Sequence, residues 1–281
     1  MSNTTILKYA GNKRKIMSTI TTSVAWGGWV GVKRYIEPFC GALGSALNAG
    51  VPSAVEVVLS DANRDLVEMY EEVVRDAQGL EDAANAMATD EVSFYAYRAW
   101  DRDPAWPGNR TKVERAARTL YLNKRGFNGL YRTNRQGYFT TPWCRNPEPR
   151  KIDAVGHGAF ISFLQTHGVP KLSDWRDPVR GAGEGDLVYC DPPYVDLKDP
   201  KKDFSGYLGA FGWKDQVELR DELEAANARG ARVVVSNSWC DATVELYDRW
   251  NRVQVSAPRN LSAKAGSRGT ISELVAWLPA P

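Results

Sequence analysis

Short apolar segments of strand character occur near both ends of the chain, and a long stretch with helical periodicity separates them. Residues 33–39 and 55–60 are rich in β-branched and aromatic residues, which predicts two strands. A glycine turn, 40–44, and a short helical segment, 45–49, lie between them. A strand, a glycine turn, a helix and a second strand indicate a βαβ unit with parallel strands.

The middle of the chain, from residue 62 to about 124, has the periodicity of amphipathic helices. Apolar residues recur there at the spacing of one helix face, as in Leu66, Met69, Tyr70 and Val73. A capping box, Thr111 with Glu114, opens a further helix. We therefore expect a mostly helical insertion, 62–150, within an α/β domain made of residues 1–61 and 151–281.

Strand signals return in the second half of the chain. A helix is expected over 214–228, with Gly230 as its stop signal. The predicted strands are 186–190, 232–236, 252–257 and 271–278. Strands that alternate with helices at both ends of the chain favour a largely parallel sheet.

Composition permits a polyanionic partner without requiring one. Hydrophobic residues make up 43%, charged residues 25%, and the net charge is only +2. Within the segment 112–150, however, only Glu114 and Glu148 are acidic, against the basic residues Lys112, Arg115, Arg118, Lys124, Arg125, Arg132, Arg135, Arg145 and Arg150. Such an excess attracts phosphates, although an ordinary solvated surface is the alternative interpretation.

Cysteine and histidine usage argues against a metal centre. The four cysteines are far apart without a C-x-x-C pair, and two histidines, His157 and His167, make a zinc site improbable, so no metal ligand and no catalytic role is assigned to them. A disulfide framework is equally improbable, which favours a reducing cytoplasm. The chain has no apolar run of about 18 residues, so we expect no membrane span. We expect a cytoplasmic monomer.

The most specific motif is Asp191-Pro-Pro-Tyr194, directly after the apolar strand 186–190. The exocyclic amine of adenine is a poor nucleophile because its lone pair is delocalised into the ring. Asp191 can accept one N–H of such an amine and the carbonyl of Pro192 the other, which frees the lone pair. Pro192 and Pro193 lock the loop, and Tyr194 offers a ring for a base to stack on. A plain loop at the end of a strand is the alternative.

A second motif, Glu37-Pro-Phe-Cys-Gly41-Ala-Leu-Gly44, indicates a ligand held by a turn of the backbone. Glu37, Phe39 and Gly41 are its candidate cofactor-binding residues, since glycines let the chain turn sharply beneath a ligand. Asp61, at the end of the next strand, stands where a carboxylate binds ribose hydroxyls. The turn lacks G-x-G-x-x-G, so a nicotinamide oxidoreductase is disfavoured, and an adenosine cofactor without a phosphate fits better.

Two further segments carry weaker signals. In the N-terminal Leu7-Lys-Tyr-Ala-Gly-Asn-Lys13, Tyr9 is a candidate to pack on a cofactor and Lys13 to pair with a carboxylate, whereas a plain basic arm is the alternative. Residues 134–137 predict a hairpin turn. The hairpin presents amides, an arginine and apolar wedges suited to reading DNA bases, namely Phe127, Asn128, Leu130, Arg132, Asn134 and Pro142. A decorated surface loop is the alternative there.

Together these motifs resemble the Dam-type (D12 class, alpha group) DNA adenine-N6 methyltransferases. The matching phrases, in the order of that group, are Lys8-Tyr-Ala-Gly-Asn-Lys13, Glu37-Pro-Phe-Cys-Gly41, Phe127-Asn-Gly-Leu-Tyr-Arg132 and Asp191-Pro-Pro-Tyr194, with looser matches at Ser236-Asn-Ser238 and Arg259-Asn-Leu-Ser262. The family more often has Trp in place of Tyr9 and Gly in place of Asn12. Its hairpin usually ends in Asn-Val-Pro, where this chain has Thr140-Thr-Pro142.

The resemblance implies a Rossmann-like class I methyltransferase sheet of seven mostly parallel strands, with helices on both faces and a DNA-recognition domain over 62–150. It implies an S-adenosyl-L-methionine site formed by Tyr9, Lys13, Asp61 and Asp191, and catalysis by the loop 191–194 on a flipped adenine in double-stranded DNA. Leu130 and Arg132 would help to read the target, often GATC in this family. An RNA or cytosine-N4 methyltransferase and a catalytically silent DNA-binding relative remain alternatives.

Overall fold

The protein is built on a seven-stranded sheet in the order β3-β2-β1-β4-β5-β7-β6. The computed structural model describes residues 4–8, 13–23, 25–134, 136–146, 149–195, 197, 199–200, 211–258 and 270–281. The strands are β1 Arg34–Glu37, β2 Glu56–Asp61, β3 Lys171–Leu172, β4 Asp186–Cys190, β5 Arg232–Ser238, β6 Asn251–Pro258 and β7 Thr270–Leu278. The predicted seven-stranded, mostly parallel sheet is therefore confirmed.

Strand β7 runs against its neighbours, and the other pairings of the described sheet are parallel. It lies between β5 and β6 and pairs antiparallel with both, whereas β1 pairs in parallel with β2 and β4, and β4 with β5. Strands β6 and β7 follow one another along the chain, so an antiparallel pair needs no crossover helix. The register sets Ser238 of β5 opposite Glu273 of β7.

Successive side chains of the central strands enter two different cores, one on each face of the sheet. Tyr35, Tyr189 and Val234 belong to one buried cluster, whereas Ile36 and Val188 belong to the other. This alternation follows from the two-residue period of a strand. Both faces are covered, which explains why β4 is fully buried along its length.

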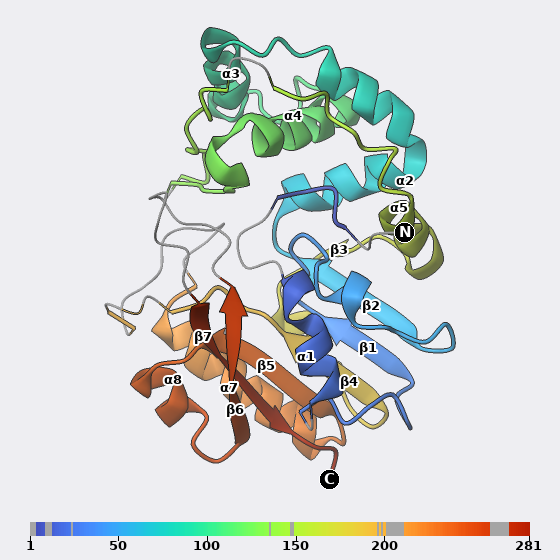
Figure 1. Cartoon of the computed structure of the whole chain (residues 1–281), viewed down its shortest axis with the longest axis vertical. Coiled ribbons are helices and arrows are strands. Elements are labelled where there is room, and N and C mark those ends of the chain that lie inside the picture. The colour runs from blue at the N-terminus through green and yellow to red at the C-terminus, as the bar shows by residue number, and fades with distance from the viewer. Residues whose placement is uncertain are drawn as a thin grey trace.

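Helices cover both faces of the sheet, as expected for this fold class (Figure 1). Leu219 and Leu223 of α7 pack in one cluster, and Met17 and Ile20 of α1 in the other. The α-helices are α1 Met17–Thr22, α2 Arg64–Asn85, α3 Glu91–Arg98, α4 Lys112–Arg125, α5 Gly158–His167, α6 Arg176–Arg180, α7 Trp213–Ala228 and α8 Asp241–Leu246. No helix within the described ranges is long and apolar enough to cross a membrane.

Helices α2, α3 and α4 gather at one end of the molecule, away from most of the sheet (Figure 1). The predicted capping box opens α4, since Thr111 Oγ1 accepts from the backbone of Glu114 and the Glu114 carboxylate accepts from the backbone of Thr111. One buried cluster nevertheless runs from Leu120 in α4 to Tyr35 in β1. The helical part therefore shares a core with the sheet, and the division at residues 62 and 150 remains a prediction.

The predicted hairpin follows α4. Its arms meet at the bridge between Thr133 and Phe139, and Thr140 N donates to Arg132 O at 2.8 Å. The turn is closed by Gly137 N, which donates to Asn134 O at 3.0 Å with a φ of 84° at the glycine. The backbone there requires a left-handed conformation, which glycine adopts at least cost.

Candidate active site

The predicted catalytic loop begins where the order of the strands reverses. From β1 the chain passes to β2 on one side, while β4 pairs with β1 on the other. The crevice outside the carboxyl ends of two such strands is where open α/β sheets bind ligands. Strand β1 ends at Glu37 and β4 at Cys190, so Asp191 and the glycine turn both start at this crevice.

Asp191 is held from two sides through a single oxygen. Ser236 of β5 donates to Oδ1 at 2.8 Å, and the Lys13 ammonium lies 3.2 Å from the same atom. Within the part of the chain that the structure describes, Oδ2 has no hydrogen-bond partner. The Asp191 side chain is 17% exposed, so a ligand in the crevice can reach this oxygen.

The charge of Asp191 is set by opposing effects. Burial raises the pKa of Asp191 above its ordinary value, and the Lys13 ammonium lowers it. The charge of Glu273 raises the pKa again, while the Ser236 hydroxyl lowers it. The carboxylate is thus a largely buried acceptor whose ionised form is favoured by Lys13 and Ser236 against the effects of burial and Glu273.

Tyr194 is fixed at its hydroxyl and covered on one ring face. Its hydroxyl donates to Glu273 Oε2 at 2.8 Å, and the Lys13 ammonium lies 4.2 Å from the ring centroid. Such a contact between a cation and a ring is attractive. Lys13 also lies 3.2 Å from Glu273 Oε2, so one ammonium joins Asp191, Tyr194 and Glu273.

Glu273 was missed by the sequence analysis. It is a charged residue within the otherwise apolar end of β7, next to Leu274 and Val275, which are fully buried. That isolated charge in a strand pattern was the available signal, because a carboxylate is buried only when it has partners.

The carbonyl groups of the two prolines in the loop differ in their hydrogen bonds. The carbonyl of Pro193 accepts from Gln216 Nε2 of α7 at 2.8 Å, and Gln216 is in turn held by Asn237 Nδ2 of β5 at 2.9 Å. Among the described residues, none donates a hydrogen bond to the Pro192 carbonyl. Together with Asp191 Oδ2, this carbonyl gives the loop a second unoccupied acceptor.

The glycine turn is tied to the end of β2 through Asp61. Asp61 Oδ2 accepts from Gly41 N at 2.8 Å and Oδ1 accepts from Asn63 N at 2.9 Å. Gly41 has a φ of 47°, in the left-handed region, and its carbonyl accepts from Tyr70. Burial raises the pKa of Asp61, and the two backbone N–H groups lower it.

Glu37 and Phe39 have protein partners in this turn. Glu37 is fully buried and accepts hydrogen bonds from the hydroxyls of Tyr35 and Ser45, and burial raises its pKa to about 8. Phe39 stacks on Trp175 with ring centroids 6.0 Å apart. Glu37 therefore braces the turn from beneath, and Phe39 is half-buried beside it. Tyr9 and the motif Arg259-Asn-Leu-Ser262 lie outside the described residues.

Comparison with known proteins identifies the family of the chain. Residues 9–261 match the family of D12 class N6 adenine-specific DNA methyltransferases. The chain belongs to this family. It is 31% identical to the type II methyltransferase M1.LlaDCHI of Lactococcus lactis subsp. cremoris, over 95% of this chain and 93% of that protein.

Two further relatives are similar along almost their whole length. The Retron Ec67 DNA adenine methylase of Escherichia coli is 31% identical over 97% of this chain and 90% of its own. The DNA adenine methylase of Escherichia coli strain K12 is 28% identical over 98% and 95%. The chain is thus an adenine-specific DNA methyltransferase with the fold of class I methyltransferases.

In this D12 methyltransferase the predicted DNA-contacting residues all lie on or beside the hairpin after α4. Arg132 and Pro142 are exposed, and Phe127 is 38% exposed. Asn128 and Leu130 are half-buried in the turn that follows α4. Asn134 stabilises the hairpin turn, because its Oδ1 accepts hydrogen bonds from the backbone N–H groups of Gln136 and Tyr138 at 3.1 and 3.0 Å.

Some of the basic residues in the segment 112–150 are buried or paired within the protein and are not available at its surface. Arg118 is 1% exposed and pairs with Asp101 at 2.8 Å, and Arg125, also buried, donates to a backbone carbonyl. Arg115 pairs with Glu68 at 2.8 Å. The expectation of one phosphate-binding patch is wrong for these arginines, because Arg115 and Arg118 point towards α2 and α3 and Arg125 points towards the backbone at residue 150.

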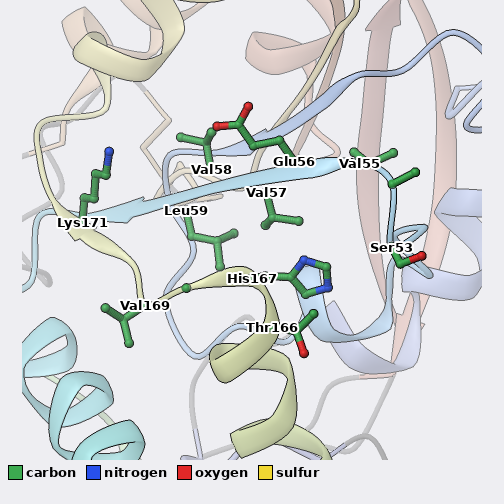
Figure 2. Close-up of a pocket in the computed structure, with 12 residues that line it drawn as sticks. Ser53, Val55, Glu56, Val57, Val58, Leu59, Thr166, His167, Val169 and Lys171 are labelled. Atoms are coloured by element: carbon green, nitrogen blue, oxygen red, sulfur yellow. The ribbon is translucent and has the colours of Figure 1, made fainter.

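An open hollow of about 560 Å³ lies elsewhere, along the outer edge of β2 (Figure 2). Strand β3 pairs only with the last two residues of β2, which leaves the earlier part of that edge beside the C-terminal end of α5. Figure 2 shows His167 and Thr166 of that helix facing Val57 across the hollow. None of the predicted site residues lines it.

Proposed function

We propose that this protein methylates N6 of adenine within a short recognition sequence of duplex DNA, using S-adenosyl-L-methionine and a target base flipped out of the helix. The observation that carries the proposal is the pair of acceptors in one rigid loop, Asp191 Oδ2 and the Pro192 carbonyl. Enzymes that act on a base inside a duplex must first extrude it from the stack, because its reacting atom is otherwise out of reach.

The charge of the crevice fits S-adenosyl-L-methionine better than a phosphate-bearing cofactor. Asp61, Asp191 and Glu273 are carboxylates, and Lys13 is the cation among them. Their excess of negative charge repels a phosphate and suits a sulfonium. Asp61 would bind the ribose, with the turn at Gly41 beneath it, while Lys13 and Tyr9 would complete the site. When bound, S-adenosyl-L-methionine supplies an electrophilic methyl group.

The loop would activate the amine by accepting both of its N–H bonds. Asp191 Oδ2 takes one and the Pro192 carbonyl takes the other, so the nitrogen becomes pyramidal and its lone pair is freed. When bound, the cofactor would supply its methyl group to this nitrogen with loss of the sulfonium C–S bond, which leaves a neutral thioether. The surplus N6 proton would pass through Asp191 Oδ2 to solvent. The ring of Tyr194 supports the base by stacking. No nucleophilic side chain is required, and Cys190 is a buried packing residue.

Target recognition is assigned to the hairpin. Arg132 is suited to guanine O6 and N7, and Leu130 and Phe127 to apolar contact or wedging between bases. Asn128 and Pro142 flank them, and Asn134 supports the turn. We infer a target of the GATC kind for the hairpin, with Thr140 and Thr141 as the departures that would change it.

The test is to incubate the protein with labelled S-adenosyl-L-methionine and unmethylated genomic DNA and to map modified bases by single-molecule sequencing. N6-methyladenine confined to one short motif is the expected result. Modified cytosine, or methylation of structured RNA in preference to duplex DNA, would contradict the proposal. Binding of the cofactor without any methylated product would identify a silent DNA-binding relative.

A further inference from the structure

A second carboxylate faces the catalytic loop from the opposite side of Lys13. Glu273 reaches the site from β7, and its side chain is only 6% exposed. Its Oε2 lies 3.2 Å from Lys13 Nζ and accepts from the Tyr194 hydroxyl at 2.8 Å. The fold does not require a charge here, because an apolar residue could occupy this buried position of β7 equally well. A buried carboxylate is also costly without partners.

We propose that Glu273 is a positioning residue for methyl transfer, which holds Lys13 away from the free oxygen of Asp191 and fixes the ring of Tyr194. The inference rests on the function proposed above. Lys13 lies equally far, 3.2 Å, from Asp191 Oδ1 and from Glu273 Oε2. The pull of Glu273 balances that of Asp191, so the ammonium does not move across to Oδ2, the atom that must accept an N–H from the target.

Through Lys13, the Glu273 carboxylate also determines which face of the Tyr194 ring is open for a base to stack on. Lys13 covers one face of the ring at 4.2 Å from its centroid, so stacking is left to the other face. The hydrogen bond from the Tyr194 hydroxyl to Glu273 prevents the ring from swinging on its side chain. Glu273 therefore acts on the target through Tyr194 and Lys13.

Two substitutions separate the effect of the Glu273 charge on Lys13 from the effect of the hydrogen bond that fixes Tyr194. Glu273→Gln keeps an oxygen that can accept from Tyr194 but removes the charge that balances Lys13. Tyr194→Phe keeps the ring and removes only the hydroxyl donor. We expect Glu273→Gln to lower kcat by at least about tenfold, equivalent to roughly 1.4 kcal/mol, with KM for DNA and cofactor changed less than about threefold. Tyr194→Phe should weaken the fluorescence change of 2-aminopurine placed at the target position.

The pH profile distinguishes positioning from a general loss of structure. The charged or titratable groups around Asp191 are Lys13, Glu37, Tyr189, Cys190, Tyr194 and Glu273. Burial raises the pKa of Asp191, Lys13 lowers it, and Glu273 raises it again. Removal of the Glu273 charge lowers the pKa of Asp191, so activity, which needs the ionised form, should persist to lower pH. The acid limb of kcat in Glu273→Gln should move downwards.

Glu81→Gln is the matched control, because Glu81 is also buried and accepts from the backbone N–H groups of Ala154 and Val155 away from the site. It should lower Tm without moving the acid limb. A Glu273→Gln enzyme with wild-type kcat and an unmoved acid limb would overturn the inference, as would an unchanged Tyr194→Phe signal. These results, with an active wild type, leave the proposed function intact, whereas an inactive wild type would remove both.

Discussion

The side-chain amide of Asn123, in α4, holds the backbone of Lys8 by two hydrogen bonds. Lys8 N donates to Asn123 Oδ1 at 3.0 Å, and Asn123 Nδ2 donates to Lys8 O at 2.6 Å. The same Nδ2 donates to the carbonyl of Gly129 at 3.1 Å. Asn123 thus joins the N-terminal arm, the helix and the turn that begins the hairpin. The arm that carries Lys13 to the proposed catalytic loop is therefore bound to the segment for which we propose DNA recognition.

Gly129 tests how closely the arm and the hairpin must approach. A Cβ at Gly129 would lie 2.4 Å from Lys8 Cβ, whereas a Cβ at Gly137 would meet nothing within 4 Å. Both glycines have positive φ, so alanine strains the backbone by roughly 1 kcal/mol at either position. We expect Gly129→Ala to lower the free energy of unfolding by clearly more than Gly137→Ala and to weaken specific DNA binding. Denaturant unfolding and binding titrations measure both. Equal losses of unfolding free energy in the two variants would show that the N-terminal arm moves to accommodate the added methyl group without cost.

Arg132 tests the assignment of base reading to the hairpin. It is exposed beside the turn, and Arg145, exposed in the same segment, is its control. Arg132→Ala should reduce discrimination between the target and a variant site by about 1–3 kcal/mol while changing non-specific affinity little. Arg145→Ala should instead weaken binding to all sequences and flatten its salt dependence. Binding isotherms at several salt concentrations separate the two. A uniform loss in Arg132→Ala would make it a phosphate contact.

Glu37 predicts how stability changes with pH. Burial raises its pKa from 4.5 to about 8, so in this range the folded protein binds a proton that the unfolded chain releases. Its contribution to stability is fully present below pH 4.5 and is lost as the pH rises through about 8. Glu37→Gln keeps the shape and cannot titrate, so it should gain stability relative to the wild type as pH rises. Thermal unfolding across this range measures the difference. Parallel curves would contradict a proton on Glu37.

The sequence predicted those elements whose signals are local. Strand β4, Asp186–Cys190, has the predicted bounds, because its apolar run ends at Asp191 and is buried on both faces. The capping box at Thr111 was likewise predicted and is present. Both signals lie within a few neighbouring residues, so no knowledge of tertiary contacts was needed.

What was missed depends on contacts between distant segments. Strand β3 has two residues, Lys171 and Leu172, and it forms through parallel pairing with the end of β2. Glu273 enters the site because β7 is inserted beside β5, and the sequence does not state that order of strands. Arg118 was predicted among the residues that attract phosphates, but the packing of α4 against its neighbours buries it. The sequence pattern showed that Arg118 is charged, but it did not show whether the side chain points to solvent or into the protein.

If Asp191 activates the amine, Asp191→Ala should affect methyl transfer and duplex binding differently, and both can be measured on the same variant. We expect a loss of methylation of about a hundredfold or more, as for removal of a preorganised polar group, with the Kd for duplex DNA nearly unchanged. Asp191→Asn, which keeps the side chain's size, should lose methylation as well, since only one of its atoms can accept. An Asp191→Ala protein that still methylates adenine at a rate near that of the wild type would show that Asp191 does not activate the amine.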